Sequence, residues 1–260
     1  MFSNLHGDVA LLKRKAKEGK YSIEPTWGYL VYRATHKNQQ LWDDYLRYLY
    51  QAVEDTVDWR VSEDLWVNPD LPINQRVGSE SELWVEAYVI KSTFHLCNRE
   101  GPEFEGRSIE DIKEINKDWL RKLKELPESE FSQMDGCLPN HLDRDNHQRT
   151  VRMAKYQYFI YADEKALAKF QEIRAANTIE GQDFAPSYKH NVAVKIAWAG
   201  YIEDESDYED MDEDEPDRTK IWQYLHIYRL PRFYDRLVGS NEAWWNRFAR
   251  PPRVNMFRGD

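Results

Sequence analysis

WGYLVYRAT, at residues 27–35, combines β-branched and aromatic residues and lies between Pro25 and a polar sequence at 36–38. This composition is typical of a β-strand. Apolar side chains then recur at helical spacing from about Gln39 to Val57, and Asn38 is suited to cap the predicted helix. A strand followed directly by an amphipathic helix indicates a protein that mixes both kinds of element.

The rest of the chain repeats this mixture. Capping-box spacing and apolar residues predict a helix over 79–94, although the same stretch also alternates partly like a strand. Residues 108–126 give a clearer helix, which ends before Pro127. The remaining predicted elements are a brief strand at 65–67, a loop at 127–150, strands at 156–163, 191–199 and 221–229, a helix capped by Asp163, and a short helix that begins near Pro231 and stops at Gly239.

Together these elements predict an α+β fold in a single domain, 1–260, with a mainly antiparallel sheet and helices packed on one face. A Tyr-apolar-apolar-Tyr core occurs at 29–32 and again at 158–161, and an amphipathic helix follows each copy. Recurrence of strand and helix is what duplicated ferredoxin-like units would produce, with half-repeats at 21–126 and 150–258. Coincidence is the alternative, because four matched positions are few.

The charge of the chain is unevenly distributed. Its formal net charge is −10, but eleven acidic residues lie within 203–217, and the remainder has 35 acidic and 36 basic residues. The run predicts a solvated acidic loop inserted between two strands, with a docking or regulatory element as the alternative. A nearly neutral body lacks the basic surface that nucleic acids require, so we expect no nucleic-acid partner.

The cysteines and the N-terminal sequence bear on the compartment. The chain has two cysteines, Cys97 and Cys137, which do not make a disulfide framework in a protein of 260 residues. The only apolar stretch near the N-terminus, Val9 to Leu12, is too short for a signal peptide, and no segment is long enough to cross a bilayer. The sequence therefore predicts a cytoplasmic protein that is not membrane-bound, with the nucleus as the alternative.

Searches for catalytic motifs find little. Glycine-rich phosphate loops, metalloprotease motifs and nucleophile elbows are missing from the sequence, so we expect no cofactor. A polar cluster from His141 to His147 could ligate a divalent metal, but a solvated loop is the favoured interpretation and no metal site is predicted. Cys97 and His95 would share a face only on a strand; a buried structural cysteine is favoured over a thiolate–imidazole pair.

The most interesting pattern is the alternation of aromatic residues on the strand at 221–229. It places Trp222, Tyr224, His226 and Tyr228 on one predicted face, and histidine is suited to proton transfer near neutral pH. Arg33 and Lys195, on other predicted strands, could bind an anionic group. Packing of the sheet against helices is the alternative. The candidate catalytic residues are His226 and Tyr224, and the candidate ligand-binding residues are Arg33, Lys195, Trp222 and Tyr228.

Several segments resemble a family of uncharacterised proteins from filamentous fungi. Its members open with a W-G-[YF]-x-[IV]-Y-R strand and close with a P-x-x-Y-D-x-L helix and a W-x-x-[FY]-x-x-P-P end. The resemblance covers roughly 27–60 and 150–255, and it rests on the segments at 27–33, 156–164, 191–198, 231–237 and 245–252. It implies a shared fold and a fungal source, and it brings no catalytic residue or ligand with it.

Two functional hypotheses follow. The preferred one is a non-catalytic binding or protein-interaction module, because aromatic and acidic segments are present without a catalytic signature. The alternative is a small cofactor-independent enzyme that acts on an apolar or aromatic metabolite between sheet and helices, with His226 as proton carrier. The expected partners are a small apolar or aromatic ligand or another protein, including a second copy in a homodimer; a pocket that contains His226 and one charged group would favour the enzyme.

Overall fold

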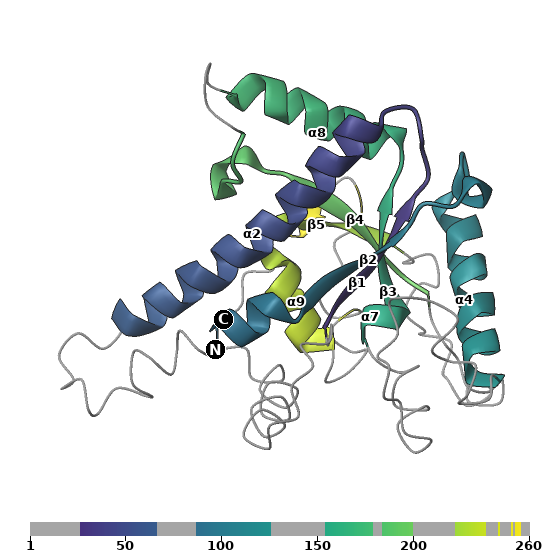
Figure 1. Ribbon diagram of the computed structural model, residues 1–260, viewed down its shortest axis with the longest axis horizontal. Coiled ribbons are helices and arrows are strands. Elements are labelled where there is room, and N and C mark those ends of the chain that lie inside the picture. Colours follow the sequence, from purple (N-terminus) through teal and green to yellow (C-terminus); the bar gives the residue numbers. More distant parts are fainter. Residues whose placement is uncertain are drawn as a thin grey trace.

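The computed structural model describes residues 27–66, 87–125, 154–178, 184–199, 222–237, 244, 251 and 253–255. Within these residues the strands form one six-stranded sheet in the order β2-β1-β3-β4-β5-β6 (Figure 1). The strands are β1 (Trp27–Arg33), β2 (Phe94–Arg99), β3 (Tyr158–Ala162), β4 (Ala193–Trp198), β5 (Trp222–His226) and β6 (Val254–Asn255). This arrangement confirms the α+β class.

Helices are interspersed among the strands. The α-helices are α2 (Gln39–Trp66), α4 (Ile109–Glu125), α7 (Ala154–Gln157), α8 (Glu164–Asn177) and α9 (Leu230–Leu237), and the 3-10 helices are η2 (Pro102–Phe104), η3 (Tyr188–His190) and η5 (Ile227–Arg229). Antiparallel pairing, which the sequence analysis expected, joins β3 to β4 and β4 to β5. By contrast, β1 is parallel to both of its neighbours, β2 and β3, and β5 is parallel to β6.

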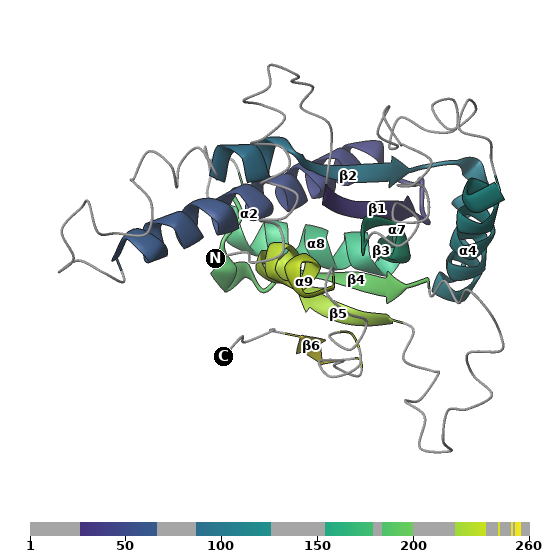
Figure 2. The same cartoon turned by 90° about the horizontal axis from the view of Figure 1, so that it is seen from below.

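Both faces of the sheet are covered, so the prediction of helices on one face is wrong. Tyr29 and Val31 pack in a core with α2, α8 and α9, whereas Leu30 and Tyr32 pack in a second core with α4 and η2. Figures 1 and 2 show α4 on the other side of the sheet from α2, α8 and α9. Every residue of β1 and β3 is buried, which is the burial expected of parallel strands covered on both faces.

Helix α2 begins where the sequence predicted but ends later than predicted. At its start, the Asn38 side chain accepts a hydrogen bond from the Leu41 backbone N–H at 2.9 Å, which confirms the predicted N-cap. At its end the helix continues to Trp66, so the predicted strand at 65–67 is wrong for Leu65 and Trp66. Buried Val53 and Val57 carry the helical spacing as far as the predicted end of the helix.

The strand β2 replaces the last part of the predicted helix over 79–94. Residues 87–92 are helical, Phe94 already belongs to β2, and 79–86 lie outside the described residues. Close pairing of β1 and β2 requires a glycine in β1. Gly28 has φ +142°, and a Cβ there would lie 1.8 Å from the backbone oxygen of His95. A larger residue at position 28 would therefore force the two strands apart.

The other predicted elements agree with the structure in most of their length. Helix α7 includes Tyr156 and Gln157, so β3 is shorter than the predicted strand, and β5 ends at His226, directly before η5. Asp163 caps α8 by accepting a hydrogen bond from the Ala166 N–H at 2.8 Å, as predicted. Gly239, the predicted loop at 127–150 and the acidic run at 203–217 lie outside the described part of the chain.

The internal repeat is only partly reflected in the fold. The two Tyr-apolar-apolar-Tyr cores lie side by side in parallel strands, with Leu30 opposite Phe159 and Tyr32 opposite Tyr161. Helices α2 and α8, which follow these strands, pack in the same core. The units then diverge, because β2 is parallel to β1 whereas β4 is antiparallel to β3. The ferredoxin-like duplication is therefore not confirmed.

Candidate functional site

The order of the strands around β1 identifies one edge of the sheet as the place for a ligand. From β1 the chain passes through α2, on one face, to β2; it then passes through α4, on the opposite face, to β3 on the other side of β1. The order of the strands therefore reverses at the β1/β3 boundary. In open sheets with parallel strands, ligands bind outside the carboxyl ends of the strands at such a reversal.

The connection that leaves this edge is rich in cations. The segment RATHK, at 33–37, begins with Arg33, the last residue of β1, and continues through His36 and Lys37 toward α2. They lead into the N-terminus of a helix of 28 residues. Because a helix N-terminus has a partial positive charge, cations placed beside it are unfavourable unless anions offset them. The connection therefore presents a local positive charge in a chain with a net negative one.

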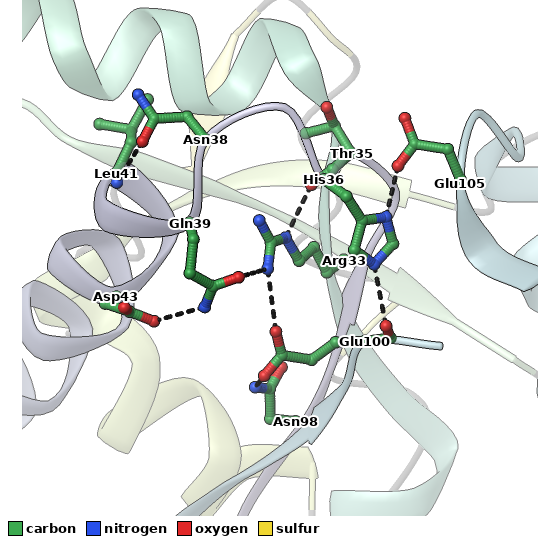
Figure 3. A network of polar contacts seen from close by, with 10 residues as sticks. All are labelled: Arg33, Thr35, His36, Asn38, Gln39, Leu41, Asp43, Asn98, Glu100 and Glu105. Atoms are coloured by element: carbon green, nitrogen blue, oxygen red, sulfur yellow. Dashed lines mark hydrogen bonds and ion pairs between the residues drawn. The ribbon is translucent and has the colours of Figure 1, made fainter. Parts of the chain in front are cut away.

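Each cation of this connection meets a carboxylate from a different part of the chain, and Figure 3 shows the pairs of Arg33 and His36. Arg33 Nη1 lies 3.0 Å from Glu100 Oε2, just beyond β2, and Lys37 Nζ lies 2.7 Å from Glu164 Oε2, at the start of α8. His36 Nδ1 contacts the carboxylate of Glu105, which follows η2. We call residues 33–37 the cation loop, and we call Glu100, Glu105 and Glu164 its carboxylates. The chain supplies the loop with anions of its own.

Arg33 has the most enclosed position of the three. The residue is 1% exposed, its Nε donates to the Thr35 backbone oxygen at 2.7 Å, and its Nη1 also donates to Gln39. The guanidinium carbon lies 5.3 Å from the centre of the Trp42 ring, within the range of a cation–π contact. The carboxylate that faces it is more accessible, because the Glu100 side chain is 35% exposed. Of this pair, Glu100 is the partner that another anion could replace.

Three of the predicted site residues, Lys195, Trp222 and Tyr224, meet on the face of the sheet that α4 covers. Lys195 Nζ lies 5.7 Å from the ring of Trp222, and the Trp222 ring lies 5.3 Å from that of Tyr224. Lys195 also contacts the carboxylate of Asp163, the residue that caps α8. Burial, followed by the charge of Asp163, raises the pKa of Tyr224, so its phenol stays protonated at neutral pH. This group forms an ion pair enclosed by aromatic rings.

The structure does not bring His226 and Arg33 together. They are separated by β3 and β4, and three strand spacings amount to about 14 Å. The predicted four-residue aromatic face is also wrong at Tyr228, because β5 ends at His226 and η5 turns the chain. Tyr228 instead packs on the α2 side, where its hydroxyl lies 3.5 Å from Asp55 Oδ2. His226 itself is 0% exposed.

The cysteine has a different state from the predicted thiol. Cys97 is buried in β2, as favoured, but it is disulfide-bonded. A thiolate–imidazole pair with His95 is therefore excluded, and the Nδ1 of His95 lies 3.4 Å from the Tyr50 hydroxyl oxygen instead. The chain has one other cysteine, Cys137, which lies outside the described residues. The expectation that the cysteines form no disulfide is therefore wrong for Cys97.

Sequence reasoning identified Arg33 but missed the residues around it. The composition of RATHK beside a predicted helix start was the available signal for His36 and Lys37. Their partners Glu100, Glu105 and Glu164 are distant in sequence, and only the parallel arrangement of β1, β2 and β3 brings them to one edge. The metal-ligand cluster considered at 141–147 is outside the described ranges, and within those ranges the His, Cys, Asp and Glu side chains form no group of three suited to a metal ion.

Comparisons with known proteins add no identity, because no family model, no curated protein and no solved structure matches this chain. Among the described helices, none has the length and apolar character to span a bilayer. The candidate site therefore rests on its own geometry.

A packing role for His226 predicts a loss of stability on truncation. We expect His226→Ala to lower the free energy of unfolding by about 2–4 kcal/mol, because it leaves a cavity at a fully buried position. Urea denaturation measures this change, with Tyr88→Ala, at a position 62% exposed, as the control expected to stay within about 0.5 kcal/mol. A His226→Ala protein as stable as the parent would contradict the packing role.

The disulfide predicts the thiol content of the purified protein. Alkylation after denaturation without reductant should label neither cysteine, and the same treatment after reduction should label both, as read by intact mass. Two labelled cysteines in freshly purified, unreduced protein would show that Cys97 is a thiol.

Proposed function

We propose that this protein is a non-catalytic binding module that holds a small ligand, through an anionic group, at the cation loop of the β1/β3 edge. The observation that carries the proposal is the burial of the Arg33 guanidinium at this edge, 1% exposed and paired with a half-exposed carboxylate. Removing a charge from water costs several kcal/mol even after the protein relaxes. A residue that only had to fill this space could be apolar.

The chemistry of Arg33 narrows the kind of ligand. A guanidinium offers a planar fork of N–H donors that matches a carboxylate or a phosphate, and one of these donors, Nη1, hydrogen-bonds to Glu100 Oε2 at 3.0 Å. The fully buried ring of Trp42 contacts the guanidinium from within the core and helps to hold the charge in place. We propose a ligand with an apolar or aromatic body and one anionic group, which is consistent with the expectation from the sequence.

The enzyme alternative has weaker support. Its proton carrier, His226, is fully buried and lies about 14 Å, or three strand spacings, from the proposed anion partner Arg33. Lys195, the other proposed anion partner, is engaged by Asp163 between two aromatic rings. These residues are better accounted for by packing than by turnover.

A protein partner is the second candidate, and two exposed aromatic residues favour it. Trp59 on α2 is 58% exposed and Tyr88 in the helical segment 87–92 is 62% exposed. An ion pair of 2.6 Å between Lys91 and Asp58 joins the two segments beside these rings. Exposed tryptophan and tyrosine are enriched where proteins bind one another.

The cellular location of the protein is also a proposal, and the disulfide at Cys97 bears on it. The sequence favours the cytoplasm, where stable disulfides are rare and those that form are usually transient. A cytoplasmic protein would thus carry the bond at Cys97 as a reversible one, whereas a stable bond would place the chain in an oxidising compartment. The fungal source implied by the resemblance is likewise retained as a proposal.

The binding proposal predicts that small aromatic carboxylates stabilise the protein. We expect benzoate to raise the midpoint of thermal unfolding in a saturable way, because a ligand that binds only the folded state stabilises it. Glu100→Gln should tighten benzoate binding about tenfold, since it removes the competing carboxylate. Arg33→Lys should abolish binding, because lysine keeps the charge without the planar fork; circular dichroism checks that this variant folds.

Arg47→Met is the matched control. Arg47 is an exposed arginine that pairs with Asp44 at 3.0 Å and lies outside the cation loop, so its loss should leave benzoate binding unchanged. Absence of saturable binding by the parent and by Glu100→Gln, or equal binding by Arg33→Lys and Arg47→Met, would refute the ligand proposal.

The protein-partner candidate has a separate test. A photo-crosslinking amino acid at position 88 should give one defined protein adduct in irradiated cells, which Trp59→Ser should reduce severalfold if both rings form one hot spot. The same amino acid at exposed Lys122 on α4 serves as the control. Identical adduct patterns at positions 88 and 122 would argue against a specific surface.

A further inference from the structure

His36 sits between two hydrogen-bond acceptors. Its Nδ1 faces the Glu105 carboxylate, and its Nε2 lies 2.8 Å from the Glu100 backbone oxygen (Figure 3). A carboxylate and a carbonyl accept hydrogen bonds and do not donate them. Both ring nitrogens must therefore carry hydrogen for both contacts to be hydrogen bonds, and an imidazole with two N–H groups is a cation. The geometry selects the protonated ring.

We propose that His36 is a pH-sensitive latch that keeps the chain's own carboxylate, Glu100, seated on Arg33 and so regulates access to the ligand site. This inference rests on the proposed function at that site. The regulation depends on Glu100, which makes two contacts. Its backbone oxygen accepts a hydrogen bond from His36 Nε2, and its side chain pairs with Arg33 Nη1. Whatever loosens the first contact loosens the position of the second.

Loss of the proton breaks the arrangement in a defined way. A neutral imidazole has one N–H and can serve only one of the two acceptors. The other acceptor, either the carboxylate of Glu105 or the oxygen of Glu100, then faces a ring nitrogen that cannot donate. The Glu105 carboxylate is the stronger acceptor, so the remaining hydrogen stays on Nδ1 and the Glu100 backbone oxygen loses its donor. The β1–α2 connection is then held at one point instead of two, and Glu100 competes less well with a ligand anion for Arg33.

The charged groups around His36 act in opposite directions. The hydrogen bond to Glu105 is the largest cause that raises the pKa of His36, and the contact with Glu100 follows, while desolvation and the charge of Arg33 lower it; the net direction is upward. In return, the contact with His36 lowers the pKa of Glu105, to which neighbouring Lys37 contributes weakly. Lys37 is itself paired with Glu164 of α8.

The sign of the stability effect follows from this direction. The pKa of His36 is raised in the folded state, so the contribution of the latch is complete below the ordinary histidine pKa of about 6.5. That contribution is lost as the pH rises through the raised pKa of the folded state. Ligand affinity moves the other way and increases over the same interval, because Glu100 is released.

Benzoate is the probe of choice, since its own charge is constant between pH 6 and pH 9. We expect its affinity for the wild-type protein to rise about tenfold across the titration of His36, and to be flat in His36→Gln, which cannot carry the charge. Coupling between two sites is reciprocal. Saturating benzoate should therefore lower the pKa of His36, measured by NMR of its ring proton, by about 1.

Two further measurements separate the latch from the binding proposal. The NMR titration without ligand should give His36 a pKa above about 6.5, and Glu105→Gln should bring it down. If benzoate binds at no pH while these values hold, the binding proposal fails and the titration of His36 still stands. A His36 pKa at or below about 6.5, or a pH dependence of benzoate affinity that persists in His36→Gln, overturns the latch.

Discussion

The structure depends on the parallel pairing of β1 with strands on both of its sides. This pairing makes β1 the centre of the N-terminal part of the sheet and buries it completely, so helices have to cover both faces. It also requires the absence of a side chain at Gly28, where the backbone of His95 leaves no space. Because parallel strands end at a common edge, the same pairing collects charged residues from distant parts of the chain beside Arg33.

The ion pairs at this edge differ in what they contribute. Lys37 and Glu164 are both mostly exposed, so their pair adds little to stability and is weakened by salt. The pair of Arg33 with Glu100 has one buried and one accessible partner, and its loss would leave a charge enclosed by protein. The edge is thus electrically neutral as built, but its neutrality depends on carboxylates that differ in how easily they can be exchanged.

Much of the fold could be predicted because its local signals are strong. Asn38 and Asp163 cap helices as their positions indicate, and the strands at β1, β4 and β5 carry β-branched and aromatic residues. The errors arose where tertiary contacts decide. Phe94 joins a strand because β1 offers it a partner, and the site was missed because Glu100 and Glu105 reach the cation loop only through the order of the strands. No local pattern encodes that order.

The two contacts of Asp163 restrict which amino acid can occupy its position. One oxygen of its carboxylate accepts a hydrogen bond from the Ala166 N–H in the first turn of α8, and the other oxygen forms an ion pair with Lys195 from β4. Asparagine or serine could cap the helix equally well, but neither would balance a lysine enclosed by two aromatic rings. Glutamate would keep the charge and lose the geometry of the cap. The two demands together confine this position to a single amino acid, although each alone would tolerate several.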